Sequence, residues 1–283
     1  MELKPSDLAP NYRAILETCE PYLVSYPGNY GALDLEPFGL RIKRERLYTA
    51  TTLASRGVVD GLHVLDAATF GGQEMLMPRW VLFDCGEFPG IVFGFGKRAR
   101  DLSPRLRDRY RVGPPASDDA FVPLSMWVAI RCAEEGAWFG HNLSSANVMG
   151  EPHDALPGLA TITKVFGVKL ARSSKQYGAT QWKSGSLALH LKLGEMHVLS
   201  AYTPAHTHAE TLAYRVDVDD VRLVQSLQPG YAPAATQGER VLAADDVEGM
   251  HALHDALERG ERWTVIRAEA RGPQAQLVHL VRG

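Results

Sequence analysis

The stretch "LPGLATITKVFGVKLARSSKQYGATQW", residues 156–182, places Lys164 between short apolar runs and three residues before Gly167. Its many β-branched and aromatic residues favour strands, so we predict strands over residues 161–172 and 178–184. A lysine is costly to bury, and a strand normally keeps it on the wet face. Two interpretations of Lys164 follow: a surface charge at a strand edge, or an amine held in an apolar pocket for chemistry.

Further strands are predicted on both sides of this stretch. Residues 79–96, "RWVLFDCGEFPGIVFGFG", are interpreted as a hairpin broken at Glu87–Gly90, and residues 120–133 as another buried strand. "SLALHLKLG" (186–194) alternates leucine with other residues and is interpreted as a strand. Helices are expected at residues 8–19 and, with clear amphipathic spacing, at 245–260. The predicted class is α+β, mainly antiparallel β, with a curved sheet or barrel around a cavity and peripheral helices.

The chain has one candidate boundary, a Pro/Gly/Ala-rich connector near residues 229–239. We predict a single β-rich, barrel-like domain with an N-terminal extension over residues 1–230. A C-terminal appendage of one helix and two strands is predicted over residues 231–283, which is short for an independent domain.

The composition of the chain argues against several classes of binding partner. The net charge of -3 argues against nucleic acid or an anionic membrane as the main partner. No apolar run approaches the roughly 20 residues that span a bilayer, and the N-terminus lacks the pattern of a signal peptide. Cys19, Cys85 and Cys132 are odd in number and far apart, which favours a reducing cytoplasm. We expect a small-molecule substrate or ligand and no cofactor; a homo-oligomer is compatible with the sequence.

A histidine group offers one kind of chemistry. In "TPAHTHAE" the His206-x-His208 pair would point both imidazoles to one face of an extended segment, and His190 from a neighbouring strand would add a third ligand for zinc or iron. The alternative is a polar loop with exposed histidines, and His190 on the polar face of its strand.

Lys164 offers another. The run "TKVFGVKL" (163–170), followed by "SGSLALHLKLGEMHVLSAYTP" (184–204), resembles acetoacetate decarboxylase and its superfamily. The earlier "GIVFGFGKRARDLSPRLRDRYRV" (90–112) and "FVPLSMWVAI" (121–130) are also similar to that family, so the resemblance covers about residues 80–225. It implies an antiparallel barrel around an apolar cavity, with Lys164 as the Schiff-base lysine and Arg98 or Arg100 binding a substrate carboxylate.

Such a lysine must be neutral to attack a carbonyl, and desolvation by neighbours such as Ile162, Val165 and Phe166 would lower its pKa. The sequence departs from the family pattern at two places. Val165 stands where the decarboxylases have a second lysine, and "PLSMWVAIR" lacks their glutamate. Glu134 and Glu135, just beyond that strand, are the candidate proton-transfer groups.

A pocket mouth is the last candidate. Its proposed substrate-binding residues come from "GAWFGHNLSSANV" and are Trp138, Phe139, His141 and Asn142. Core aromatic residues beside a polar turn would explain the same segment.

Three hypotheses follow from the sequence. The first is a lyase-type enzyme, decarboxylase-like in its use of Lys164 on a small oxo acid or related carbonyl compound. The second is a non-catalytic barrel that binds a small molecule. The third is a metal-dependent barrel enzyme that uses the three histidines.

Overall fold

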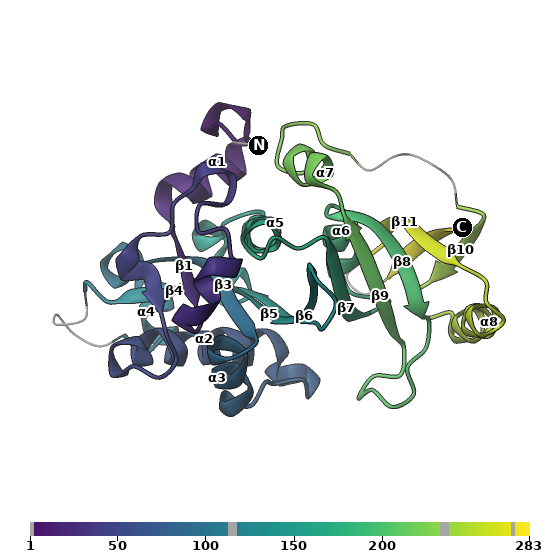
Figure 1. Ribbon diagram of the computed structural model, residues 1–283, viewed down its shortest axis with the longest axis horizontal. Helices are drawn as coiled ribbons and strands as arrows, with labels where there is room; N and C mark the ends of the chain where they lie inside the picture. The colour runs from purple at the N-terminus through teal and green to yellow at the C-terminus, as the bar shows by residue number, and fades with distance from the viewer. Residues whose placement is uncertain (1–2, 113–117, 233–237, 273–274) are drawn as a thin grey trace. The chain divides into compact units, whose positions relative to one another are not determined.

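The computed structural model describes residues 3–112, 118–232, 238–272 and 275–283. The chain divides into two compact units, which Figure 1 shows in ribbon form. Unit 1 is Met1–Ala133 with Gly140–Arg172, and unit 2 is Glu134–Phe139 with Ser173–Gly283. The candidate boundary near residue 230 falls in the range of unit 2, and residues 233–237 beside it lie outside the described part. The division into 1–230 and 231–283 stays a prediction.

Unit 1 holds five α-helices and most of the N-terminal strands among its described residues. The helices are α1 (Pro10–Thr18), α2 (Arg56–Phe70), α3 (Arg79–Glu87), α4 (Pro104–Arg109) and α5 (Leu159–Leu170). The strands are β1 (Glu20–Val24), β2 (Leu47–Tyr48), β3 (Gly90–Arg98), β4 (Phe121–Pro123) and β5 (Ser125–Arg131). Strand β6 (Ala137–Ser145) is shared, with residues 137–139 in unit 2 and 140–145 in unit 1.

The sheet of unit 1 separates two layers of helices. Its order is β5-β3-β1-β2, with β4 also paired to β3, and every pairing except the parallel β1–β2 is antiparallel. Alternate residues of β3 face opposite sides. Val92 lies toward Gly86 of α3, whereas Phe93 and its cross-strand partner Trp127 lie toward α5. Figure 1 shows α5 on one side of these strands and α2 and α3 on the other.

Helix α5 corrects the strand predicted over residues 161–172. Ten of its twelve residues are buried, so its apolar side chains do not form a stripe with a helical period. A short apolar run without such a stripe can belong to a buried strand or a buried helix, and the β-branched residues favoured the wrong choice. Lys164 is therefore a helical residue, and α5 is a core helix rather than a peripheral one.

Two other strand predictions are also wrong. The first half of the hairpin predicted at residues 79–96 is helix α3, and only the second half is strand β3. "SLALHLKLG" contains the short helix α6 (Ser186–His190), followed by a turn into β8 (Gly194–Ser200). The leucines at every second position of this segment are buried in a compact turn of chain and not on one face of a sheet.

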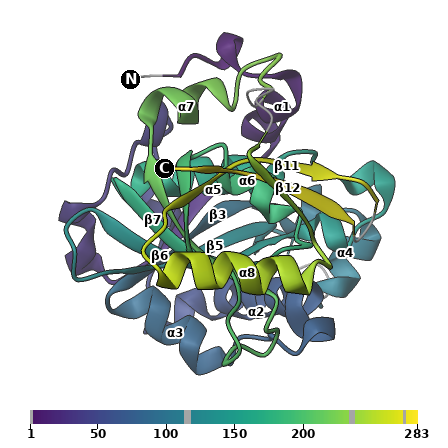
Figure 2. The same ribbon diagram turned by 90° about the vertical axis from the view of Figure 1, so that its right-hand side faces the viewer.

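Unit 2 is an antiparallel sheet with three helices among its described residues. The strands not yet given are β7 (Lys175–Gln181), β9 (Thr211–Val218), β10 (Arg240–Ala243), β11 (Trp263–Ala270) and β12 (Gln276–Arg282). Their order is β10-β12-β11-β8-β9-β7. Besides α6, the helices are α7 (Asp220–Gln225) and α8 (Val247–Glu258). Helix α8, which Figure 2 shows in the foreground, is the amphipathic helix predicted at 245–260. Arg240 Nη2 of β10 donates to the carbonyl of Gly249 in this helix at 2.9 Å.

The predicted class, mixed helix and strand with mainly antiparallel pairing, is confirmed. Within the described residues the strand order of each unit begins and ends on different strands, so these sheets are open and not closed barrels. No helix in the described ranges is long and apolar enough to cross a membrane.

Candidate functional site

Lys164 is held against an indole ring by the geometry of α5. Residues three apart lie on one face of a helix, so Lys164 and Gly167 share a face, and both meet Trp127 of β5. The Lys164 Nζ lies 4.5 Å from the centroid of the Trp127 ring. Gly167 leaves room for the ring, because a Cβ there would come 2.3 Å from Trp127 Cε3. The Lys-x-x-Gly spacing thus places the Lys164 amine and the missing side chain of Gly167 against the same tryptophan ring.

The amine of Lys164 is buried. Only 2% of the residue is exposed, and burial lowers its pKa from 10.5 to about 7. Desolvation disfavours the ammonium form, and no charged neighbour in the described part of the chain contributes to the change. With a pKa of about 7, a large fraction of this amine is neutral near pH 7. The interpretation of Lys164 as a solvated strand-edge charge is wrong.

Two polar side chains close to Lys164 and Trp127 in the sequence are paired, whereas within the described ranges the Trp127 indole N–H is not. Thr163 Oγ1 and Ser125 Oγ lie 2.6 Å apart, and Tyr22 OH donates to the Ser125 carbonyl at 2.6 Å. The fully buried Trp127 keeps an indole N–H that has no hydrogen-bond partner among the described residues. An unpaired buried donor is uncommon and costs about 1–3 kcal/mol, so a bound ligand with an oxygen acceptor would satisfy it.

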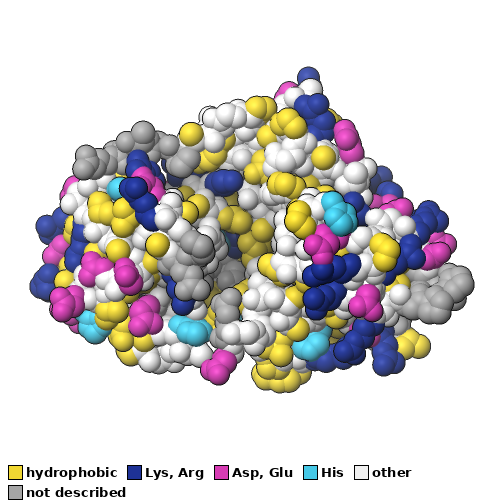
Figure 3. All heavy atoms as spheres, turned by 180° about the vertical axis from the view of Figure 1, so that it is seen from behind, with side chains coloured by type: hydrophobic (Ala, Val, Ile, Leu, Met, Phe, Trp, Pro, Cys, Tyr) yellow, Lys and Arg dark blue, Asp and Glu magenta, His cyan; other side chains and the backbone are white. Residues whose placement is uncertain are grey.

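Arg98 and Arg100 lie together but pair with a surface carboxylate. Both Nη1 atoms donate to Asp119 Oδ1, at 3.0 and 2.9 Å, and Asp119 is 70% exposed. Two other arginines of the same basic segment also have acidic partners, Arg107 with Asp118 and Arg105 with Glu151. Figure 3 likewise shows Lys and Arg side chains next to Asp and Glu on the face it draws. Since burial alone lowers the pKa of Lys164, neither arginine acts on that amine in this structure.

Glu134 and Glu135 lie in the turn before β6 and belong to unit 2. Glu134 pairs with Lys175 Nζ and accepts from Tyr177 OH at 3.1 Å. The hydrogen bond from Lys175 is the main cause that lowers the pKa of Glu134. Glu135 is exposed. A carboxylate already stabilised as an anion is a poor proton donor at neutral pH, and their role in proton transfer stays a prediction.

The predicted pocket mouth divides between the two units. Trp138 and Phe139 belong to unit 2, where Trp138 is buried and its carbonyl accepts from Gln176 Nε2 at 3.0 Å. His141 and Asn142 belong to unit 1 and contact each other, with His141 Nδ1 2.8 Å from Asn142 Oδ1.

Asn142 also reaches a buried carboxylate. Its Nδ2 donates to Asp66 Oδ1 at 2.6 Å, and the backbone N–H of Met77 donates to Asp66 Oδ2 at 2.6 Å. Burial raises the pKa of Asp66 despite these bonds. Asn142 therefore has a clear structural role in satisfying Asp66.

The three histidines lie in two different local settings. His190 is buried in α6 with its ring 4.8 Å from that of Tyr214. His206 and His208 share one loop, where His206 Nδ1 accepts from the backbone N–H of His208 at 3.1 Å, but both are half-buried rather than exposed as the polar-loop interpretation expected. Across the described residues, no group of three or more His, Cys, Asp or Glu side chains is placed to hold a metal ion.

Sequence reasoning missed Trp127 and Asp66. Trp127 lies inside an apolar strand, where an aromatic residue is expected in the core and gives no signal of a functional role. If residues 159–170 had been treated as a helix, Lys164 and Gly167 would have shared a face, and a bulky partner opposite the glycine would have been expected. Asp66 follows His63 by three residues in α2, so the two residues share one face of that helix. This relationship could be noticed only if the segment had been predicted to be helical.

No family model, curated protein or solved structure matches this chain.

Proposed function

We propose that the protein is an enzyme for small carbonyl compounds, such as oxo acids, that forms a Schiff base through Lys164. The observation that supports this proposal is the amine itself, which is 2% exposed with its pKa lowered to about 7 by burial. Enzymes activate a nucleophilic lysine in this way, by desolvating it in an apolar pocket. The resemblance to the acetoacetate decarboxylase superfamily leads to the same residue.

The chemistry needs few groups beside the amine. The neutral Lys164 Nζ attacks the carbonyl carbon, and the resulting carbinolamine loses water to give an imine. The protonated imine then accepts the electron pair from a bond that breaks next to it, in a lyase step such as decarboxylation. The unpaired indole N–H of Trp127 supports the proposal, because it would donate to an oxygen of the bound substrate.

The proposal includes a setting. The substrate would occupy a cavity beside the sheet of unit 1, and the protein would work in the cytoplasm. The three cysteines, Cys19, Cys85 and Cys132, are free thiols, which supports a reducing compartment.

Borohydride trapping tests the nucleophile. The full chain is incubated with a panel of small oxo acids and sodium borohydride, and the adduct is located by intact mass and peptide mapping. We expect one reduced adduct, on the peptide that contains Lys164, with a rate that rises with pH around a midpoint near 7. Lys164→Met should abolish it. Lys169→Met, a change of the other lysine of α5, is the matched control and should leave the adduct unchanged.

A non-catalytic ligand-binding protein is the second candidate, and the unpaired Trp127 N–H favours it equally. It predicts stabilisation by a ligand without turnover, and tolerance of Lys164→Arg. If a panel that labels a known Schiff-base enzyme gives no adduct with the wild-type chain, this second function replaces the first.

A further inference from the structure

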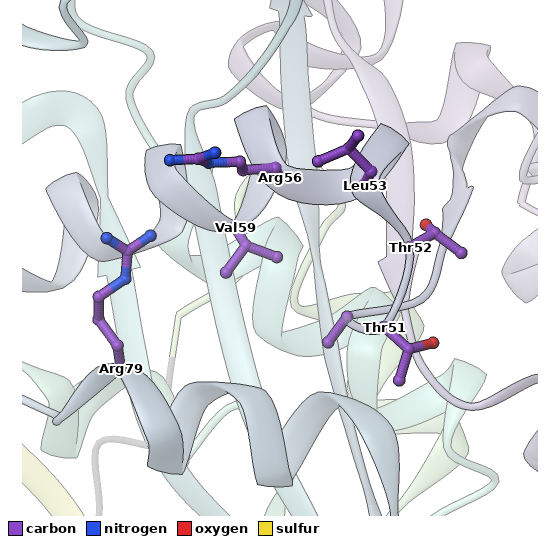
Figure 4. Close-up of a pocket in the computed structure, with 7 residues that line it drawn as sticks. Thr51, Thr52, Leu53, Arg56, Val59 and Arg79 are labelled. Atoms are coloured by element: carbon purple, nitrogen blue, oxygen red, sulfur yellow. The ribbon is translucent and has the colours of Figure 1, made fainter.

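A second candidate site lies in unit 1, on the opposite side of the sheet from Lys164. It is a pocket of about 330 Å³, lined by Ala50, Thr51, Thr52, Leu53, Arg56, Val59 and Arg79. Helices α2 and α3 supply Arg56, Val59 and Arg79, and these helices pack on the sheet face that α5 does not cover. Figure 4 shows the two guanidinium groups on one side of Val59 and the two threonines on the other.

The first feature of this pocket is an unfavourable concentration of positive charge. Arg56 is the first residue of α2, and Arg79 is the first residue of α3. Neither helix has an acidic residue in its first turn or a side-chain hydrogen bond from its N-cap. The N-terminus of a helix carries a partial positive charge, so a cation there is disfavoured and an anion is favoured. Two such ends, each with a guanidinium, line the same pocket.

The second feature is that these two arginines share one carboxylate. Arg79 Nη2 pairs with Asp60 Oδ1, and Arg56 Nε lies 3.8 Å from Asp60 Oδ2. Within this group of three side chains the guanidiniums exceed the carboxylate by one positive charge, and the nearby Glu87 carboxylate bonds to the loop residues Thr49, Ala50 and Thr51 instead. Each guanidinium has five N–H donors in a planar fork, so donors remain for a second acceptor. The Asp60 carboxylate shows that one anionic group can contact both arginines at once.

The third feature is an apolar side of the pocket, next to a loop that is held in place by hydrogen bonds. Leu53 is 82% exposed beside the arginines, although leucine is normally covered, and Val59 and Ala50 add further apolar surface. This loop is anchored by the buried Glu87, which accepts from the backbone N–H of Ala50 at 2.9 Å and from the Thr51 hydroxyl at 3.3 Å. The pocket therefore combines a cationic side with an apolar side.

We propose that this pocket binds a small organic oxyanion. The phosphate or carboxylate group would lie between Arg56 and Arg79, where planar guanidiniums form paired, charge-assisted hydrogen bonds. A compact apolar group would cover Val59 and Leu53. The site is independent of Lys164, and the proposed Schiff-base function does not depend on it.

Calorimetric titration of the full chain tests the proposal with three probes at low ionic strength: inorganic phosphate, phenyl phosphate and benzoate. We expect saturable binding, tighter for phenyl phosphate than for inorganic phosphate because of the apolar side of the pocket. The ratio of the dissociation constants of benzoate and phenyl phosphate shows whether the arginines prefer a carboxylate or a phosphate. Arg56→Gln and Arg79→Gln should each weaken binding about tenfold or more.

Two further variants make the test specific. Asp60→Asn removes the competing carboxylate and should tighten binding about threefold, a gain that unfolding cannot produce. Arg41→Gln removes the same charge from an 81% exposed arginine outside the pocket, paired with Glu36, and should bind like the wild type. The proposal is overturned if the wild-type chain shows no saturable binding, if Arg41→Gln loses as much as the pocket variants, or if Asp60→Asn binds no tighter.

Discussion

Gly167 lies against the ring of Trp127 so closely that the two residues depend on each other. A Cβ on Gly167 would come 2.3 Å from Trp127 Cε3 and 2.8 Å from Cζ3, far inside ordinary contact. One turn earlier on the same helix face, the Lys164 amine lies over that ring. Gly167 therefore sets how closely the Trp127 ring approaches helix α5. The ring in turn forms part of the surface that desolvates the Lys164 amine.

Gly167→Ala should destabilise the protein by about 1–2 kcal/mol. Overpacking a core costs about 1–3 kcal/mol, and the better helix propensity of alanine returns up to about 1 kcal/mol. Urea denaturation measures the change. Gly57→Ala in α2 is the control, because a Cβ at Gly57 meets no atom within 4 Å, and it should stabilise by up to about 1 kcal/mol. Equal effects of the two substitutions would contradict the close contact.

Lys164→Met should stabilise the protein at pH 7 while it abolishes carbonyl trapping. The pKa falls from 10.5 to about 7, which at about 1.36 kcal/mol per unit corresponds to roughly 5 kcal/mol of lost stability. Methionine fills similar space without a charge to desolvate, and after imperfect packing we expect a gain of roughly 2–4 kcal/mol. Thermal and urea unfolding measure it. A destabilised Lys164→Met variant would show that the amine makes favourable contacts that outweigh its burial.

The stability of the wild-type protein should depend on pH through Lys164. Below about pH 7 the lysine is protonated in both the folded and the unfolded state, so the full penalty is present. Between about 7 and 10.5, the unfolded state holds a proton that the folded state has released, so the free energy of unfolding rises with pH. The advantage of Lys164→Met over the wild type should therefore shrink from about pH 7 to about pH 10. Urea denaturation of both chains across this range measures the difference, and a constant difference would mean an ordinary lysine pKa.

Glu87→Ala should release the loop at residues 49–51. The Glu87 carboxylate is 4% exposed and accepts from the Thr49 hydroxyl at 2.9 Å and from the Ala50 N–H at 2.9 Å. Loss of a buried acceptor with these partners should cost about 1–3 kcal/mol, measured by urea denaturation. Glu45→Ala, at an exposed glutamate, is the control and should change stability by less than about 0.5 kcal/mol. Hydrogen exchange should become faster at Ala50 in the Glu87 variant alone.

Several elements could be predicted because their own residues carry the signal. Helix α8 has a clear amphipathic spacing, and strands β5, β11 and β12 are bounded by turn residues. Helix α2 was not expected, because Asp60-Gly61 and Gly71-Gly72 are typical of turns. Gly61 instead packs against Pro123, where a Cβ would come 2.7 Å from the proline ring. That packing is a tertiary reason for a glycine, and local sequence does not show it.

The sequence by itself determined which residues are apolar, and so it singled out Lys164 as an amine between apolar neighbours. Only the tertiary structure decided that this segment is a helix, because α5 is covered on nearly every side and its residues carry no amphipathic period. The same packing brought Trp127 under the amine from a distant strand, which no local pattern encodes. It also brought the first residues of α2 and α3 to one pocket, where Arg56 and Arg79 share Asp60. Burial and long-range proximity, which set the pKa and the charge balance of a site, are properties of the packed chain.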